Sequence, residues 1–256
     1  MVDRVCEMMA RAGGSDSVFP ATVLYNEGWL LRLVLDAFDR YRPFGHPLAP
    51  ADGAGWFSEA LLPSAFLPSS RSDPLGESWT HADGVVGHFD VGRTGRADLE
   101  LAEGASQFVV IEAKMFSKLS PGISHARYYD QAARNVACMA EVLYRARKDP
   151  SELQHLAFFV VAPQSQIDDG AFGDLVTHDS VRSKVERRVS EYGGKRGNWL
   201  ADAFDPLAAE LDLGCTSWEQ LLKDIAQSSR STAESLERFY QDCVRYNQPT
   251  RGPGER

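Results

Sequence analysis

The sequence has no apolar run long enough to cross a membrane and no cysteine pair with metal-binding spacing. No segment of its 256 residues approaches the ~20 apolar residues that a membrane-spanning helix needs. The N-terminus carries Asp3 and Glu7 and no apolar core, so it does not resemble a signal peptide. The four cysteines are far apart and none forms a Cys-x-x-Cys pair, which argues against zinc and redox motifs. These absences predict a protein of the reducing cytoplasm, with no membrane partner.

The chain also lacks an excess of positive charge. Its formal net charge is -9, which argues against a protein that coats nucleic acid through bulk charge. It shows no internal repeat, no low-complexity region, no helix-turn-helix and no zinc finger. The hydrophobic fraction of 43% is enough to fill a core, and the length suits one large domain or a core domain with additions.

Two β-prone segments, Ala97–Leu101 and Gln107–Lys114, carry the most informative charged residues. Side chains alternate along a strand, so Glu112 and Lys114 point to the same face of the second segment. A short Gly-containing stretch between the segments is typical of a hairpin turn. Antiparallel pairing across that turn would bring Asp98 close to Glu112 and Lys114.

Two carboxylates and an ammonium group on one sheet face are costly unless something binds there, and a divalent cation fits best. Asp98 and Glu112 are the expected direct ligands, with the Ala113 carbonyl oxygen as an additional one. Glu100 shares a face with Asp98 and is the reserve ligand. The alternative is a plain surface ion pair.

An Asp followed one strand later by Glu-x-Lys resembles the PD-(D/E)xK, or restriction-endonuclease-like, nuclease superfamily. Asp98, Glu112 and Lys114 match the motif and Ala113 is its variable position, whereas the family's proline before the Asp is absent here. The resemblance implies that the two acids hold Mg²⁺ or Mn²⁺ and that the lysine orients the attacking water. It implies a metal-dependent nuclease that acts on nucleic acid, DNA more than RNA, in a defence, restriction or mobile-element setting.

The order of expected elements is helix, three-strand meander, helix, strand. This is the order of the superfamily's core, and it predicts an α/β fold with a mixed sheet flanked by helices over residues 22–163. The last strand is a nearly continuous apolar run, which predicts burial on both faces and parallel pairing with its neighbour. The expected ranges are a helix over 22–41, a short helix over 56–62, strands over 83–91, 97–101 and 107–114, a helix over 124–148 and a strand over 153–163.

Two residues on the flanking helices are expected to reach the same site. Glu27 lies on the apolar stripe of the first helix, between Val23 and Leu30, where a carboxylate needs a partner or a metal. Gln131 lies on the long helix, and the superfamily often places a glutamine there. Ordinary salt bridges and a polar helix face are the alternatives for both residues. Glu59 is a further candidate for the role of Glu27.

The rest of the chain is expected to support the core. Residues 1–21 are predicted to be a weakly structured lead-in, residues 164–248 a helical extension packed on the core, and residues 249–256 a disordered tail. The helical extension could form a homodimer. One basic segment could contact nucleic acid or could be a solvated helix face. Its residues are Arg182, Lys184, Arg187, Arg188, Lys195 and Arg196.

Three other functions compete with the nuclease. The first is a non-catalytic nucleic-acid-binding or scaffold module that keeps the nuclease fold, and the intact Glu-x-Lys pattern argues against it. The second is a glycosidase with paired carboxylates, which would give Lys114 no role. The third is a non-enzymatic α/β protein whose charges are structural.

Overall fold

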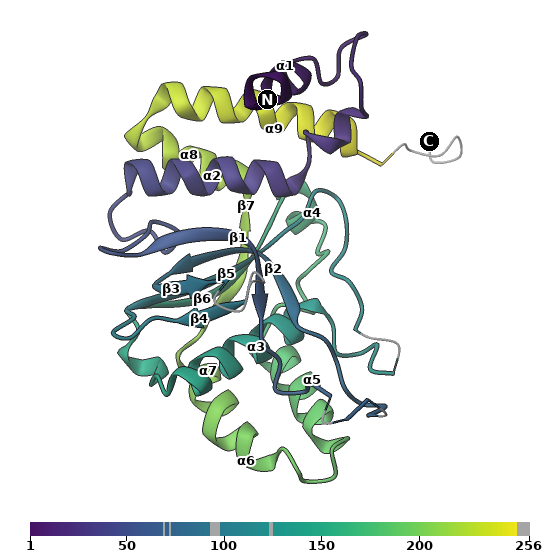
Figure 1. Cartoon of the computed structure of the whole chain (residues 1–256), viewed down its shortest axis with the longest axis vertical. Coiled ribbons are helices and arrows are strands. Elements are labelled where there is room, and N and C mark those ends of the chain that lie inside the picture. The colour runs from purple at the N-terminus through teal and green to yellow at the C-terminus, as the bar shows by residue number, and fades with distance from the viewer. Residues whose placement is uncertain (69, 72, 93–97, 123–124, 250–256) are drawn as a thin grey trace.

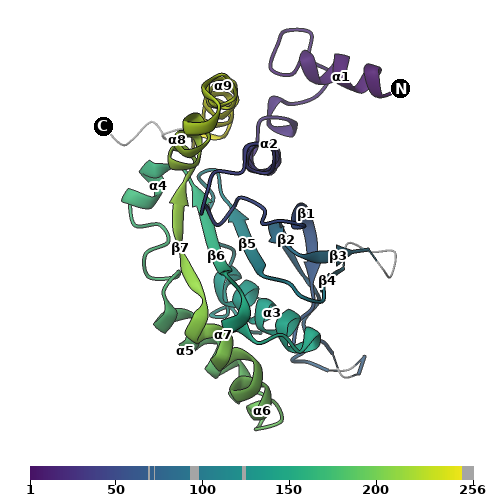
Figure 2. The same ribbon diagram turned by 90° about the vertical axis from the view of Figure 1, so that its left-hand side faces the viewer.

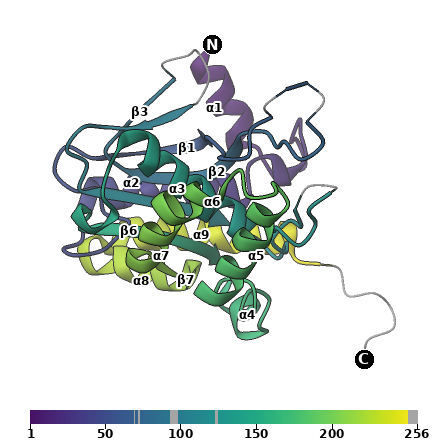
Figure 3. The same ribbon diagram turned by 90° about the horizontal axis from the view of Figure 1, so that it is seen from below.

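The structure is a computed structural model that describes residues 1–68, 70–71, 73–92, 98–122 and 125–249. A five-stranded mixed sheet forms the middle layer (Figure 1). Helices α2, α8 and α9 cover one face, and α3, α5, α6 and α7 lie on the other, the face that Figure 3 shows from below. The predicted α/β class with helices on both sides of a mixed sheet is therefore confirmed.

The strand order is β1-β2-β5-β6-β7, and Figure 2 shows the strands side by side. β2 is antiparallel to β1 and β5, whereas β5, β6 and β7 are mutually parallel. The predicted burial of the apolar β6 and its parallel pairing are confirmed. The strands are β1 Gly55–Leu62, β2 Thr80–Gly87, β3 Phe89–Val91, β4 Leu99–Leu101, β5 Gln107–Ala113, β6 His155–Ala162 and β7 Asp212–Ser217.

The helices pack through apolar stripes against this sheet. The α2 residues Leu30, Leu31 and Phe38 are fully buried, as their helical spacing predicts. The helices are α1 Val2–Ala10, α2 Glu27–Tyr41, α3 Gln131–Ala146, α4 Gln164–Asp168, α5 His178–Ser190, α6 Gly197–Trp199, α7 Asp205–Glu210, α8 Trp218–Ser228 and α9 Arg230–Asn247. In the part of the chain that the structure describes, no helix has the length and apolar character needed to span a bilayer.

Helices α2 and α3 both begin later than the sequence indicates, each after a residue whose side chain caps it. The Oδ1 atom of Asn26 accepts the backbone N–H of Trp29, so α2 begins at Glu27 and Val23 is 54% exposed. Asp130 caps α3 in the same way, so that helix begins at Gln131. The predicted start at Ser124 lies outside the described residues.

The predicted meander is wrong in its pairing. The segment 56–62, expected to be helical, is the edge strand β1, because its pairing with β2 overrides its local preference. β4 pairs with β3, and these two strands form a separate two-stranded sheet. They lie between β2 and β5 in the sequence, but β2 and β5 are neighbours in the main sheet. The strand that contains Glu112 therefore pairs with β2 and not with the segment of Asp98.

The two ends of the chain also differ from expectation. Residues 1–21 were expected to be weakly structured, but they include α1, which has no buried residue and lies away from the sheet (Figure 2). The segment 164–248 is not wholly helical, because β7 adds a strand beside β6. Four consecutive residues of β7 are half-buried, and its six residues include too few apolar side chains to predict a strand. Of the expected disordered tail, residues 250–256 lie outside the described residues.

Candidate active site

Glu112 lies at the carboxyl end of β5 and is fully buried. It points to the face of the sheet that α3 covers, two residues from Lys114, as alternation along a strand requires. Its Oε1 atom accepts hydrogen bonds from Lys114 Nζ and from Gln131 Nε2, each at 2.6 Å. Its Oε2 atom accepts from Asn135 Nδ2 at 3.1 Å. The carboxylate is thus held by three donors in a fixed position.

Asp83 is the second carboxylate of this site. The pairing of β2 with β5 ends at Gly84 and Ile111, so Asp83 lies where the two strands separate. Its Oδ2 atom accepts the backbone N–H of Ala113 at 2.8 Å. The sequence analysis placed Asp83 at the start of a strand but gave it no role at the site.

Burial and the negative charge of Asp83 act together on Glu112. Burial is the larger cause, and with the nearby charge of Asp83 it raises the pKa of Glu112 to about 8, although Lys114 opposes the shift. A carboxyl group with such a pKa is mostly protonated at neutral pH, even with the Lys114 ammonium beside it. Perturbed acids of this kind are typical of binding and catalytic sites.

The loop after β5 orients Gln131. Its Oε1 atom accepts the backbone N–H of Ser120 at 3.1 Å, which directs its Nε2 donor toward Glu112. The backbone N–H of Gln131 also donates to the Ser120 carbonyl oxygen. The structure therefore brings the predicted Gln131 to Glu112, with Asn135 one turn further along α3.

The C-terminal part of the chain reaches the site through Trp218. This fully buried residue donates its indole N–H to the carbonyl oxygen of Lys114 at 3.0 Å. The backbone N–H of Lys114 donates to the Val161 carbonyl oxygen of β6 at 2.8 Å. Lys114 therefore has a fixed backbone, and the residue as a whole is only 8% exposed. No pattern around Trp218 in the sequence points to this contact.

A cavity of about 420 Å³ opens onto these residues. Its lining includes the predicted residues Glu27, Glu112, Ala113, Lys114 and Gln131, together with Asp83. Glu27 is half-buried at the first turn of α2. Glu59, the other candidate for the role of Glu27, also lines the cavity.

The oxygen donors of the cavity fit a magnesium-like cation. Asp83 and Glu112 offer hard carboxylate oxygens, and Mg²⁺ binds through one or two carboxylates while keeping several waters or substrate oxygens. A cation would also offset the repulsion that raises the pKa of Glu112. Among the described residues, no group of three or more His, Cys, Asp or Glu side chains is arranged to hold a metal ion. The fit therefore rests on two acids.

The structure does not bring Asp98 or Glu100 to this cavity. Asp98 is buried and forms an isolated bridge with Leu61 of β1, which β2 separates from β5. At a strand spacing of ~4.8 Å, this places Asp98 roughly 14 Å from β5. Glu100 lies in β4 and lines a different cavity, with Val142 and Arg145. Both expectations depended on pairing of their segment with β5, and that pairing does not form.

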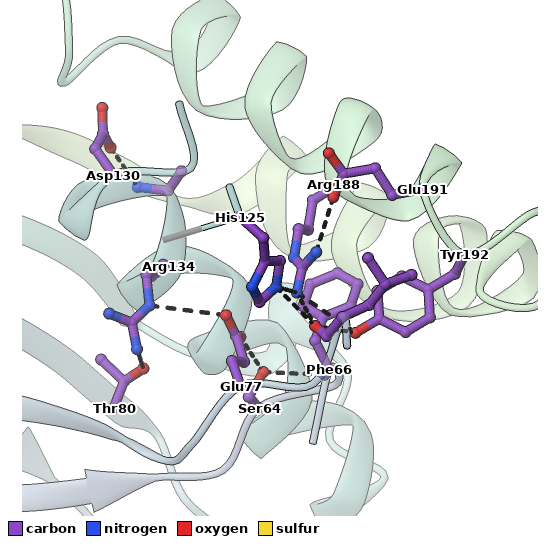
Figure 4. Close-up of polar contacts among 12 residues, drawn as sticks. Ser64, Phe66, Glu77, Thr80, His125, Asp130, Arg134, Arg188, Glu191 and Tyr192 are labelled. Atoms are coloured by element: carbon purple, nitrogen blue, oxygen red, sulfur yellow. Dashed lines mark hydrogen bonds and ion pairs between the residues drawn. The ribbon is translucent and has the colours of Figure 1, made fainter. Parts of the chain in front are cut away.

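A second cluster of charged side chains includes Glu77, Arg134, Arg188 and Glu191 (Figure 4). Arg188 of α5 is fully buried, and its guanidinium group donates to Glu191 at 2.8 Å and to the Leu75 carbonyl oxygen. Arg134 of α3 lies 3.8 Å from Glu77, which accepts a hydrogen bond from the Ser64 hydroxyl. The aromatic rings of Phe66, Tyr129 and Tyr192 surround the Arg188 guanidinium. This cluster ties the segment before β2 to α5.

Most of the predicted basic patch is engaged within the molecule. Lys184 pairs with Asp130 at 2.6 Å, and Arg182 pairs with Asp205 at 2.7 Å. Of the remaining members, Arg188 is buried, Arg187 and Arg196 lie over the rings of Tyr128 and Tyr192, and Lys195 is exposed.

The lengths of the two acidic strands indicate which of them pairs with β5, and so which acid, Asp83 or Asp98, reaches Glu112. Val85 and Val86 follow Asp83 in an eight-residue strand, whereas the Asp98 segment supplies only the three residues of β4. A longer apolar strand is the better partner for the buried β5. Comparison with known proteins adds no family: no family model, no curated protein and no solved structure matches this chain.

Proposed function

We propose that this protein is a metal-dependent nuclease that hydrolyses phosphodiester bonds in nucleic acid. The observation that carries the proposal is the cluster of Asp83, Glu112 and Lys114 at one cavity, with Lys114 Nζ 2.6 Å from Glu112. It is an Asp, Glu-x-Lys set of the PD-(D/E)xK kind in which Asp83 replaces Asp98. Apart from the β3–β4 pair, which is inserted between β2 and β5 in the sequence, the order α2, β1, β2, β5, α3, β6 also follows the helix, three strands, helix, strand order of that superfamily.

Each residue of the cluster has a role in this proposal. Asp83 and Glu112 would hold the cation, and Lys114 would hold the attacking water or contact the phosphate. Gln131 keeps the Glu112 carboxylate in place. A bound Mg²⁺ or Mn²⁺ would neutralise charge at the phosphate and lower the pKa of the attacking water. The water oxygen bonds to phosphorus, the bond from phosphorus to the departing sugar oxygen breaks, and that oxygen takes up a proton.

The balance of charges favours an enzyme over a scaffold. A buried carboxylate with a raised pKa lowers stability, and a module that only binds the anionic phosphates of nucleic acid gains nothing from a carboxylate. Lys114 likewise has a role in phosphodiester hydrolysis and none in a glycosidase.

The test is cleavage of plasmid, linear duplex, single-stranded DNA and RNA with Mg²⁺, with Mn²⁺ or with EDTA. We expect cutting with either metal and none in EDTA. Lys114→Ala and Glu112→Ala should abolish it, whereas Lys223→Ala and Glu100→Ala, which alter residues at other cavities, should cut normally. Normal cutting by Lys114→Ala would refute the assignment.

A further inference from the structure

The α2 side of the cavity carries an exposed tryptophan. Trp29 is 37% exposed and is the one aromatic residue among those that line the cavity in the described part of the chain. Its backbone N–H is fixed by Asn26 at 3.0 Å. An indole ring beside a cluster of carboxylates offers a flat apolar surface to a ligand that binds there.

Arg32 lies next to this ring and is held in place by its neighbours. Its Nε–H donates to the Ser58 hydroxyl at 2.8 Å, and its Nη2 atom lies 3.4 Å from Glu59. Its guanidinium carbon lies 5.1 Å from the centroid of the Trp29 ring. The side chain nevertheless keeps 27% of its surface exposed and lines the cavity.

The backbone beneath Arg32 is strained. Glu59 has a φ of 61° inside strand β1, a left-handed conformation that non-glycine residues rarely adopt. Such strain persists where the surrounding structure requires it, often at binding sites. Here it accompanies the contact of Glu59 with Arg32.

The charges of the cavity limit how it can hold a nucleic acid. Arg32 and Lys114 are the cations among its described lining residues, and they face four carboxylates. Phosphate neutralisation, which supplies most of the affinity of duplex-binding proteins, is therefore weak at this site. Stacking of a base on an aromatic ring does not depend on net charge, but it needs an unpaired base, because neighbouring pairs cover the bases of a duplex.

We propose that Trp29 stacks on an unpaired nucleobase beside the scissile phosphate and that Arg32 holds the adjoining phosphate. The substrate is then a single-stranded or locally unpaired nucleic acid. This inference rests on the proposed nuclease function and adds the substrate class to it.

The test is binding of short fluorescein-labelled oligonucleotides to the full chain in Ca²⁺ and in EDTA. Single-stranded DNA and single-stranded RNA both supply unpaired bases and show which sugar is preferred. A blunt-ended duplex is the probe without unpaired bases. Trp29→Ala should weaken single-strand binding by about tenfold, Trp29→Phe should retain most of it, and duplex binding should not change. Arg32→Ala should lower the slope of log Kd against log salt by about 0.7, the value for one phosphate contact to a single strand.

Two matched variants serve as controls. Tyr144→Ala removes a 49% exposed aromatic residue near the far end of α3, and Arg40→Ala removes an arginine from the last turn of α2. Both should bind as the wild type does. The proposal is overturned if Trp29→Ala binds single strands normally, or if Tyr144→Ala loses as much affinity.

The result is separable from the nuclease test. Trp29-dependent binding without cleavage in any metal would support this inference and refute the nuclease. If the wild type cleaves and Trp29→Ala leaves KM and kcat unchanged, the nuclease function is supported and this inference is refuted.

Discussion

Two groups of charged side chains contact helix α3, and they differ in how their charges are balanced. In one group, Glu77 and Glu191 face Arg134 and Arg188. In the other group, which Gln131 and Asn135 contact, two carboxylates, Asp83 and Glu112, meet the single ammonium of Lys114. The first group is closed over by aromatic rings, whereas the second lines a cavity.

The difference separates a structural cluster from a binding cluster. Charges that are matched in number and packed against aromatic rings hold segments of the chain together. Acids that outnumber their cation beside a cavity are balanced either by a proton, as on Glu112, or by a cation that binds there. We therefore expect the two groups to respond in opposite ways to substitution.

The largest expected effect concerns Asp83. Asp83→Asn keeps an oxygen that can accept the Ala113 N–H but loses the charge, so cutting should fall by roughly 1000-fold or more, with little change in stability. The measurement is initial cleavage rate at saturating Mg²⁺. Asp98→Asn is the control and should keep its rate within a few-fold. If Asp98→Asn lost as much activity as Asp83→Asn, Asp98 would have to be counted among the active-site residues.

The next effect concerns the group of Glu77, Arg134, Arg188 and Glu191. Arg188→Met leaves Glu191 without its cation and removes the ring contacts, so the free energy of unfolding should fall by roughly 3–5 kcal/mol. Urea denaturation measures this change. The folded variant should still cut. Arg187→Met, which alters the exposed neighbour that stacks on Tyr128, should cost about 1 kcal/mol or less.

The third effect is a pH dependence of stability. The folded chain holds the Glu112 proton up to pH about 8, whereas the unfolded chain releases it near 4.5, so the wild type loses stability as pH rises between these values. The advantage in unfolding free energy of Glu112→Gln over wild type should therefore grow by roughly 3 kcal/mol from pH 5 to pH 8 in EDTA. A difference that stays constant with pH would contradict the burial argument.

The smallest effect tests Tyr129. Its buried hydroxyl makes no hydrogen bond to the described residues. Because removing such a group costs no hydrogen bond, Tyr129→Phe should change the free energy of unfolding by less than about 1 kcal/mol, as thermal and urea denaturation would measure. A much larger loss would mean that this hydroxyl has a partner in solution.

The sequence predicted those parts of the site that depend on local periodicity. Glu112 and Lys114 share a face because side chains alternate along any strand. The apolar run of β6 and the stripe of Leu30, Leu31 and Phe38 on α2 likewise depend on neighbours within a few residues. Both predictions are confirmed, because these residues of β6 and α2 are buried in the structure.

The parts that failed depend on pairing between distant segments. Asp83 and Asp98 are both acids upstream of Glu112, and the β3–β4 hairpin decides which strand lies beside β5. The same is true of Trp218, which reaches Lys114 across more than a hundred residues of sequence, and of Lys184, which is paired with Asp130. Local patterns thus determined which side chains share a face. Only the tertiary structure decided which faces meet, because strand order and helix packing depend on the burial of the whole core.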